Sequence, residues 1–187
     1  MTACGSTFKK DIHKGSCMRK SLILVLVLIL ISPFNAYALD YKVIHVVDGD
    51  TFVATDGIVE FKVRIVGMDA PESKQDYGQL AKAFLAKLVE DQMVTLKPIK
   101  KPLDRYNRVL AQVFVHDADV ADLMIAEGLA YYYRPTCQDY PIDKKKYDFD
   151  PVGYVEKEAM AKKQNLGFWK EAARQLPCQY RKLHPYR

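Results

Sequence analysis

A hairpin signal in the first third of the chain limits the fold most strongly. Asp56-Gly57 separates two short runs rich in β-branched and aromatic residues, 51–54 and 58–66, and Asp-Gly between such runs is typical of a tight β-turn. In the second run apolar side chains alternate with charged ones, among them Arg64, so the two kinds face opposite sides of a strand. We therefore expect an antiparallel hairpin whose ends distal to the turn lie side by side.

The rest of the chain extends this pattern to a small barrel. Further strands are predicted at 41–47, 93–99 and 109–115, and helices at 77–90, from Asp119 to the stop at Gly128, and at 154–164. The first helix should bury a stripe made by Tyr77, Leu80, Phe84 and Leu88. Five short strands with a helix between the third and fourth suit an α+β, mainly β fold, namely an OB-fold five-stranded barrel with three helices.

The first 38 residues are typical of an export signal. Arg19 and Lys20 precede an aliphatic run at 22–31, and Ala36-Tyr37-Ala38 offers a small-x-small cleavage pattern. Met18 is the expected initiator, because a signal peptide would start normally there. The predicted protein is therefore exported to the periplasm or the extracellular space, and the alternative is an uncleaved membrane anchor. The predicted divisions are 1–38 (signal peptide), 39–170 (main domain) and 171–187 (C-terminal tail).

Charge and cysteine content add two constraints. Five basic residues and one acidic residue precede Leu39, which lowers the net charge of the remainder from +5 to +1, so bulk charge does not argue for a nucleic-acid partner. Of the four cysteines, Cys137 and Cys178 lie outside the leader. An even pair in an oxidising compartment indicates a disulfide that would tie the tail to the main domain, and the alternative is two unpaired buried thiols.

Acidic side chains gather at the distal end of the predicted hairpin. Asp50 closes the turn before the first strand, and Asp69 follows the second. Two carboxylates held this close repel each other unless a cation lies between them, and hard oxygen ligands favour Ca²⁺ or Mg²⁺. Glu72 follows Pro71, which directs its side chain back to the same corner.

Basic side chains converge on the same place. Arg64 projects from the hairpin, and Asp104-Arg105-Tyr106-Asn107-Arg108 supplies two more guanidinium groups from a loop. A metal, a carboxylate base and several arginines can together cleave a phosphodiester, because the ion polarises the phosphoryl oxygen while arginines bind the charge that develops.

At these residues the chain resembles the thermonuclease family, the staphylococcal nuclease-like domains. The matching pieces are "DGDT" at 48–51, "VRIVGMDAPE" at 63–72, "DRYNR" at 104–108, "EGLAY" at 127–131 and "NLGFW" at 165–169. The resemblance implies a calcium-dependent endonuclease that acts on DNA and RNA and leaves 3′-phosphate ends.

The resemblance also implies a role for each matching residue. Arg64, Glu72 and Arg108 would be catalytic, and Asp50, Asp69 and the backbone carbonyl of Ala70 would bind Ca²⁺. Tyr106 would lie against the substrate phosphate, and Arg105 is a second candidate for substrate binding. The family's base-stacking tyrosines have no match, since Arg134 and Thr136 stand at those positions. We expect a monomer without a stable protein partner, and the competing interpretation is a non-catalytic OB-fold module that binds nucleic acid or protein.

Overall fold

The computed structural model describes residues 39–134, 137 and 149–185. The chain divides into two units, Met1–Tyr37 and Ala38–Arg187. The predicted signal peptide, with its expected start at Met18, lies outside the described residues, as does Thr136. No helix in the described part of the chain is long and apolar enough to cross a bilayer.

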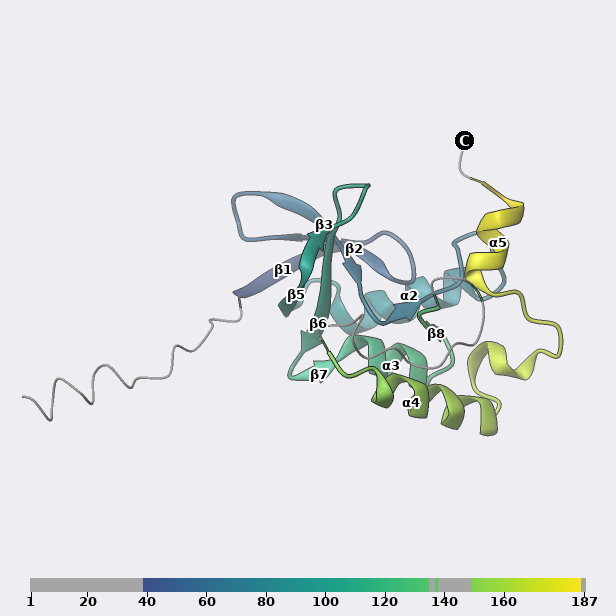
Figure 1. The fold of residues 1–187 in the computed structure, drawn as a ribbon. Helices are drawn as coiled ribbons and strands as arrows, with labels where there is room; N and C mark the ends of the chain where they lie inside the picture. The colour runs from purple at the N-terminus through teal and green to yellow at the C-terminus, as the bar shows by residue number, and fades with distance from the viewer. Residues whose placement is uncertain (1–38, 135–136, 138–148, 186–187) are drawn as a thin grey trace, which may run out of the picture. The chain divides into compact units, whose positions relative to one another are not determined.

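Five strands close into the predicted OB-fold barrel (Figure 1). Their order is β3-β2-β1-β5-β6, and β3 also pairs with β6 in parallel, which closes the barrel. The two-residue strand β7 (Ala118–Asp119) continues the sheet beyond β6. The barrel strands are β1 (Leu39–Val46), β2 (Thr51–Thr55), β3 (Glu60–Ile65), β5 (Met93–Leu103) and β6 (Val109–Val115).

The expected hairpin is present between β2 and β3. Their register runs from Thr51 opposite Arg64 to Thr55 opposite Glu60. Asp56 organises the connection, because its Oδ1 accepts hydrogen bonds from the amides of Ile58 and Val59, each at 2.9 Å. This side-chain turn keeps 58–59 out of the ladder, so β3 begins two residues later than predicted.

Helix α2 (Gly78–Val89) covers the barrel with a different face from the one predicted. Its buried side chains are those of Ala81, Leu85 and Val89, whereas Leu80 is 53% exposed. Tyr77, Phe84 and Leu88 are only partly buried at the margin of the core. The small Ala81 allows the close approach: a Cβ added to Gly49 would lie only 2.9 Å from the Cβ of Ala81. The sequence analysis assigned the largest side chains to the buried face, so it placed that face at the wrong angle around the helix axis.

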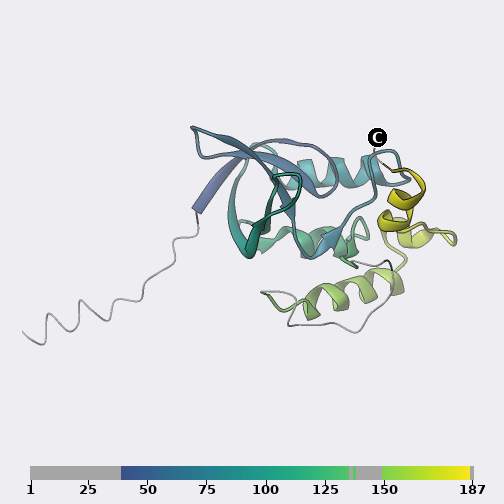
Figure 2. The ribbon, with the colours of Figure 1, turned by 45° about the horizontal axis from the view of Figure 1, so that its top comes forward.

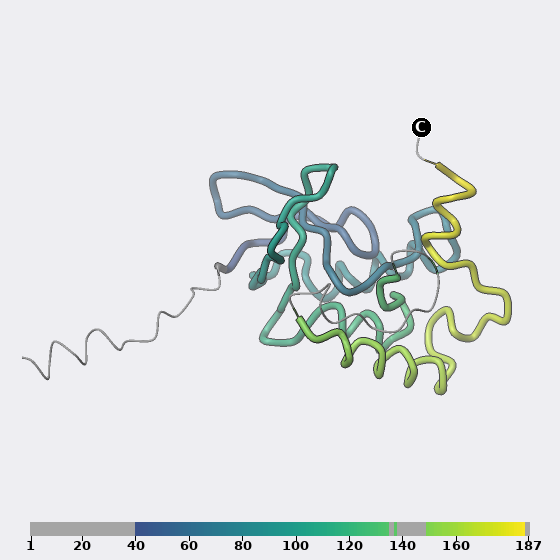
Figure 3. Tube along the Cα trace, viewed as in Figure 1, coloured from purple at the N-terminus to yellow at the C-terminus, as the bar shows by residue number. Residues whose placement is uncertain are grey.

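The described part of the chain contains four α-helices rather than three. The additional one is α5 (Pro177–Leu183), in the segment that was predicted to be a C-terminal tail tied by a disulfide. Helices α3 (Val120–Ala126) and α4 (Val152–Lys163) run side by side (Figures 1 and 2). Asp119 caps α3, since its Oδ1 accepts the amides of Ala121 and Asp122. The tube in Figure 3 shows α5 beside the segment that joins β4 (Met68–Asp69) to α2.

Two segments that resemble family motifs pack directly on each other. Gly128 and Gly167 both have positive φ, and a Cβ on Gly167 would lie 2.0 Å from the carbonyl oxygen of Gly128. The 3₁₀ turn η2 (Gly167–Lys170) then places Phe168 against Tyr131, with stacked rings 4.0 Å apart. Tyr131 begins β8 (Tyr131–Tyr132), which pairs with β4 and so supports the strand that carries Asp69.

A buried ion-pair network on α4 supports β8 from the other side. Glu158 is 2% exposed, and its Oε1 accepts the amide of Tyr132 at 3.1 Å. Its Oε2 pairs with Arg134 and with Lys162 Nζ at 2.9 Å. Burial alone would raise the pKa of Glu158, but the hydrogen bonds and charges of Arg134 and Lys162 outweigh it and hold the pKa below its ordinary value.

Glu158→Ala should lower the free energy of unfolding by about 3–5 kcal/mol, because it leaves the partner cations without their buried carboxylate. Denaturant unfolding measures the loss, with Glu156→Ala as a control at an exposed site on the same helix. Since the folded pKa of Glu158 is lowered, its contribution is present above the ordinary glutamate pKa and disappears as the pH falls through the folded value. If the free energy of unfolding of Glu158→Ala stays equally far below that of the wild type at strongly acidic pH, this account is contradicted.

Candidate active site

The predicted meeting of Asp50 and Asp69 occurs at the distal end of the hairpin, with Arg64 between them. Arg64 Nη2 lies 3.1 Å from Asp50 Oδ2 and 3.2 Å from Asp69 Oδ1. Its Nη1 also donates to the carbonyl oxygen of Met68 at 3.0 Å. All three charged side chains are largely buried, so each interaction is stronger than at the surface.

The backbone around Gly49 fixes the position of Asp50. A Cβ on Gly49 would lie 2.6 Å from the Cβ of Ala70, so only glycine lets this turn approach β4 so closely. The contact allows the amide of Ala70 to donate to Asp50 Oδ2 at 3.2 Å. Asp50 Oδ1 accepts the hydroxyl of Thr51 at 3.0 Å, and the amide of Asp50 donates to Asp48 Oδ1 at 3.0 Å.

The crowding of carboxylates changes the acid–base behaviour of the site. Burial, reinforced by the charge of Asp50, raises the pKa of Asp48 to about 7. Burial also raises the pKa of Asp69, although Arg181 and Arg64 oppose the shift. Burial would lower the pKa of Arg64, but the charges of Asp50 and Asp69 raise it. The corner therefore holds more negative charge than its buried surroundings favour, and further positive charge would stabilise it.

Glu72 lies at the same corner, three residues after Asp69. Pro71 before it is buried, and the amide of Glu72 is held by Gln75 Oε1 at 3.2 Å. The Glu72 side chain is 19% exposed, so solvent and substrate can reach it. Its Oε1 accepts a hydrogen bond from Arg181 Nη1 at 2.7 Å.

Arg108 reaches the corner from the loop between β5 and β6. Asp104 shapes this loop, since its Oδ1 accepts the amides of Tyr106 and Arg108 at 2.8 and 3.0 Å. Asn107 takes the left-handed conformation, with φ of 59°. Asp104 Oδ2 pairs with Arg108 Nε at 2.8 Å, and Arg108 Nη1 lies 3.3 Å from the hydroxyl of Thr51. Thr51 thereby links Arg108 to Asp50.

The predicted substrate-binding residues, Tyr106 and Arg105, lie on the outer side of this loop. Tyr106 is 59% exposed, and Arg105 and Arg108 both approach its ring. Arg105 Cζ is 4.7 Å and Arg108 Cζ is 5.4 Å from the ring centroid. The structure does not bring Tyr106 and Arg105 into the buried cluster, but it leaves them accessible beside Arg108.

The carboxylate oxygens at the corner are of the kind that a hard divalent cation prefers. Asp50 and Asp69 offer carboxylate oxygens on either side of Arg64 Nη2, and Ala70 meets the same corner through its amide, which donates to Asp50. Oxygen donors without nitrogen or sulfur are the set that Ca²⁺ prefers. Within the described residues, however, no group of three or more His, Cys, Asp or Glu side chains is arranged to hold a metal ion. With only the carboxylates of Asp50 and Asp69 available, we expect a divalent cation to bind weakly.

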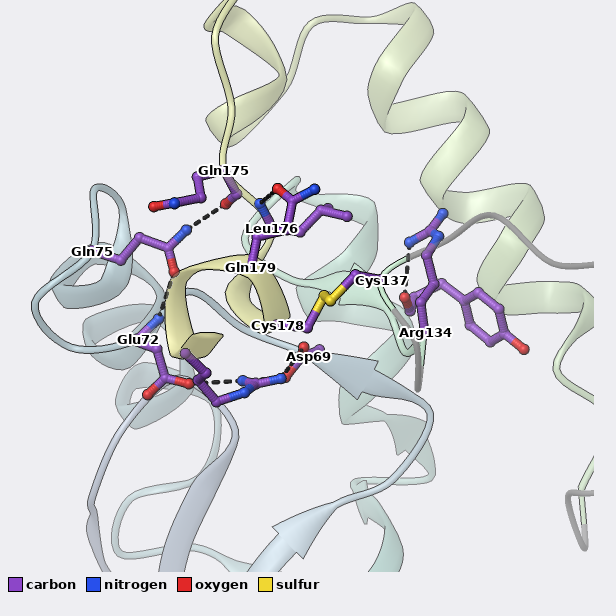
Figure 4. Close-up of a disulfide and its surroundings, with 11 residues drawn as sticks. Asp69, Glu72, Gln75, Arg134, Cys137, Gln175, Leu176, Cys178 and Gln179 are labelled. Carbon is purple, nitrogen blue, oxygen red and sulfur yellow. Dashed lines mark hydrogen bonds and ion pairs between the residues drawn. A yellow bond between two sulfur atoms is a disulfide. The ribbon is translucent and has the colours of Figure 1, made fainter. Parts of the chain in front are cut away.

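One residue of the cluster was missed by the sequence analysis. Arg181, on α5, pairs with Asp69 at 2.9 Å and with Glu72 at 2.7 Å. A disulfide between Cys137 and Cys178 brings α5 to the corner (Figure 4), as the cysteine count had suggested. In the chain-entropy account, closing this loop stabilises the fold by about 4 kcal/mol. Cys178 lies three residues before Arg181, and this spacing was the available signal.

Comparisons with known proteins agree with the geometry. The model of a protein family described as "Staphylococcal nuclease homologue" matches residues 62–171. An "Uncharacterized endonuclease" of Escherichia coli is 34% identical over 156 residues, which cover 83% of this chain and 92% of the relative. A "Micrococcal nuclease" of Shigella flexneri is 32% identical, with coverage of 82% and 87%. A "Thermonuclease" of Staphylococcus hyicus is 32% identical, with coverage of 71% and 78%.

Proposed function

Because the chain belongs to the staphylococcal nuclease family, we propose that it is an exported, calcium-dependent endonuclease that leaves 3′-phosphate ends on DNA and RNA. Nuclease activity follows from the family, whereas the ion, the products and the export are specific to this proposal. The observation that carries it is the convergence of Arg64, Asp50, Asp69 and Glu72 at one corner of the barrel, with Arg108 linked through Thr51.

In this proposal Asp50, Asp69 and the carbonyl of Ala70 hold Ca²⁺. A bound ion would polarise a phosphoryl oxygen and lower the pKa of a water molecule. A bound ion would also offset the negative charge gathered at the corner, where Arg64 and Arg181 both pair with Asp69.

Glu72 is the general base. It accepts a proton from the water that attacks phosphorus. The P–O5′ bond breaks and the departing O5′ takes a proton from solvent, so one product keeps the phosphate on its 3′ oxygen and the other leaves with a 5′-hydroxyl. Arg64 and Arg108 bind the non-bridging oxygens as their charge grows in the transition state. Tyr106 and Arg105 contact the substrate beside the cleaved bond.

Export is supported by the leader at 1–38 and by the disulfide, since disulfides persist in oxidising compartments. Fractionation of producing cells, with the mass of the mature protein, tests this part. The expected N-terminal residue is Leu39, and a protein retained at full length in the membrane would overturn it.

Removal of calcium should abolish most of the activity. The purified protein should nick supercoiled plasmid and degrade RNA in Ca²⁺, and a calcium chelator should lower both rates at least about 10²-fold, since the ion stabilises transition-state charge. Product ends are tested with a DNA polymerase, which should extend them only after phosphatase treatment. Undiminished cleavage in chelator would remove calcium from the proposal, and directly extendable ends would contradict 3′-phosphate products.

A further inference from the structure

Arg181 pairs with two of the three carboxylates that the proposed chemistry needs, those of Asp69 and Glu72. Its Nη2 lies 2.9 Å from Asp69 Oδ2, and its Nη1 lies 3.1 Å from Asp69 Oδ1, so one guanidinium fork binds both oxygens of Asp69. The same Nη1 is 2.7 Å from Glu72 Oε1. Forked arginine–carboxylate pairs are the strongest of the common charged hydrogen bonds.

This contact differs from the one that Arg64 makes. Arg64 projects from a barrel strand, and its side chain is only 12% exposed. Arg181 comes from the outside on a short helix, and a third of its side chain remains exposed. Arg181 can therefore leave the corner by a movement of α5 alone, without opening the barrel.

Several contacts fasten α5 beside the corner. The Cys137–Cys178 disulfide anchors its first turn, as Figure 4 shows. Gln75, which also holds the amide of Glu72, donates its side-chain amide to the carbonyl of Gln175. The hydroxyl of Tyr77 bonds to Glu171 at 3.1 Å. A tethered group has a high effective concentration at its target, and a shorter tether raises it further.

We propose that Arg181 is an internal competitor of the divalent cation, and that the Cys137–Cys178 disulfide sets the strength of the competition. This inference rests on the proposed function, because it takes Asp69 as a cation ligand and Glu72 as the base. With Arg181 docked, both oxygens of Asp69 are engaged, and a guanidinium at this position repels an incoming cation. The contact between Arg181 Nη1 and Glu72 Oε1 also takes up the oxygen that would face the attacking water. Cation binding and catalysis then require α5 to withdraw Arg181.

Cation binding itself tests the competition, independently of activity. Isothermal titration with Ca²⁺ is compared for the mature wild-type protein, Arg181→Gln and Lys182→Gln. Arg181→Gln should bind Ca²⁺ about tenfold more tightly, within the range of typical couplings between sites. Lys182 is the exposed neighbour on the same helix, so Lys182→Gln removes an equal charge and should leave the affinity unchanged.

The disulfide provides a second arm. Cys178→Ser, or treatment of the wild type with dithiothreitol, which reduces the bond to two thiols, should also tighten Ca²⁺ binding. Neither change should add to Arg181→Gln, because the competing group is already gone. Thermal unfolding verifies that each variant is folded under the conditions of the titration.

The outcomes separate this inference from the proposed function. If wild type and Arg181→Gln bind Ca²⁺ equally, or if the variant binds more weakly, the competition is overturned while calcium dependence stands. If neither protein binds Ca²⁺, the calcium assignment fails and the competition fails with it. If Arg181→Gln binds Ca²⁺ more tightly than the wild type but Cys178→Ser does not, Arg181 competes with the cation without control by the disulfide. The proposed role of the disulfide is then overturned.

Discussion

Glu72→Gln should lower kcat by about 10²–10⁴-fold, the usual contribution of a general base. Glutamine keeps the size of the side chain and can still face Arg181, but it cannot accept the proton of the attacking water. The rate is measured on a defined DNA duplex at saturating Ca²⁺, so that a change in cation affinity does not enter.

Glu60→Gln is the matched control for this experiment. Glu60 is exposed at the start of β3, at the other end of the strand that carries Arg64. It loses the same charge far from the corner and should retain full activity. A folded Glu72→Gln protein with a wild-type rate would remove Glu72 from the mechanism and leave the identity of the base open to Asp48 or water alone.

Arg108→Ala should lower kcat/KM at least about 10²-fold, comparable to the loss of one preorganised donor to a developing oxyanion. Arg108→Lys should restore little, because a lysine ammonium cannot reproduce the planar fork that pairs with Asp104 and faces Thr51. Steady-state kinetics on the same duplex measure both variants.

Lys101→Ala provides the control for general charge attraction. Lys101 is exposed on β5, so its removal tests how much of the effect comes from weaker steering of the nucleic acid. If Lys101→Ala and Arg108→Ala lose the same modest amount, Arg108 acts only as part of the positive surface.

The hairpin and its acidic corner could be predicted because their signals are local. The Asp56-Gly57 turn sets a register that the structure confirms from Thr51 to Thr55, and that register brings Asp50 beside Arg64. Barrel closure followed from the number and spacing of strands, and the structure confirms it through the β3–β6 pairing.

The failures were in features that depend on distant contacts. The buried face of α2 is rotated because Ala81 fits against the Gly49 turn, a contact between segments that no helical periodicity reports. The position of Arg181 depends on a residue pair 112 positions apart, Asp69 and Arg181, and on a short helix that the disulfide between Cys178 and Cys137 links to the rest of the domain. A tail with one cysteine and scattered charges carries no periodic signal for such a site.

The parallel pairing of β3 with β6 has a consequence for how this enzyme can fail. Arg64 stands opposite Leu110 along this seam, and Arg108 precedes β6 by one position, so the spacing of the two arginines is set where the two ends of the curved sheet join. Each hairpin could persist on its own with the seam parted, yet the arginines would then no longer share a target. Cleavage of a phosphodiester therefore depends on the closed barrel. Local separation of β3 from β6 would abolish activity although most hydrogen bonds between the other strands remain.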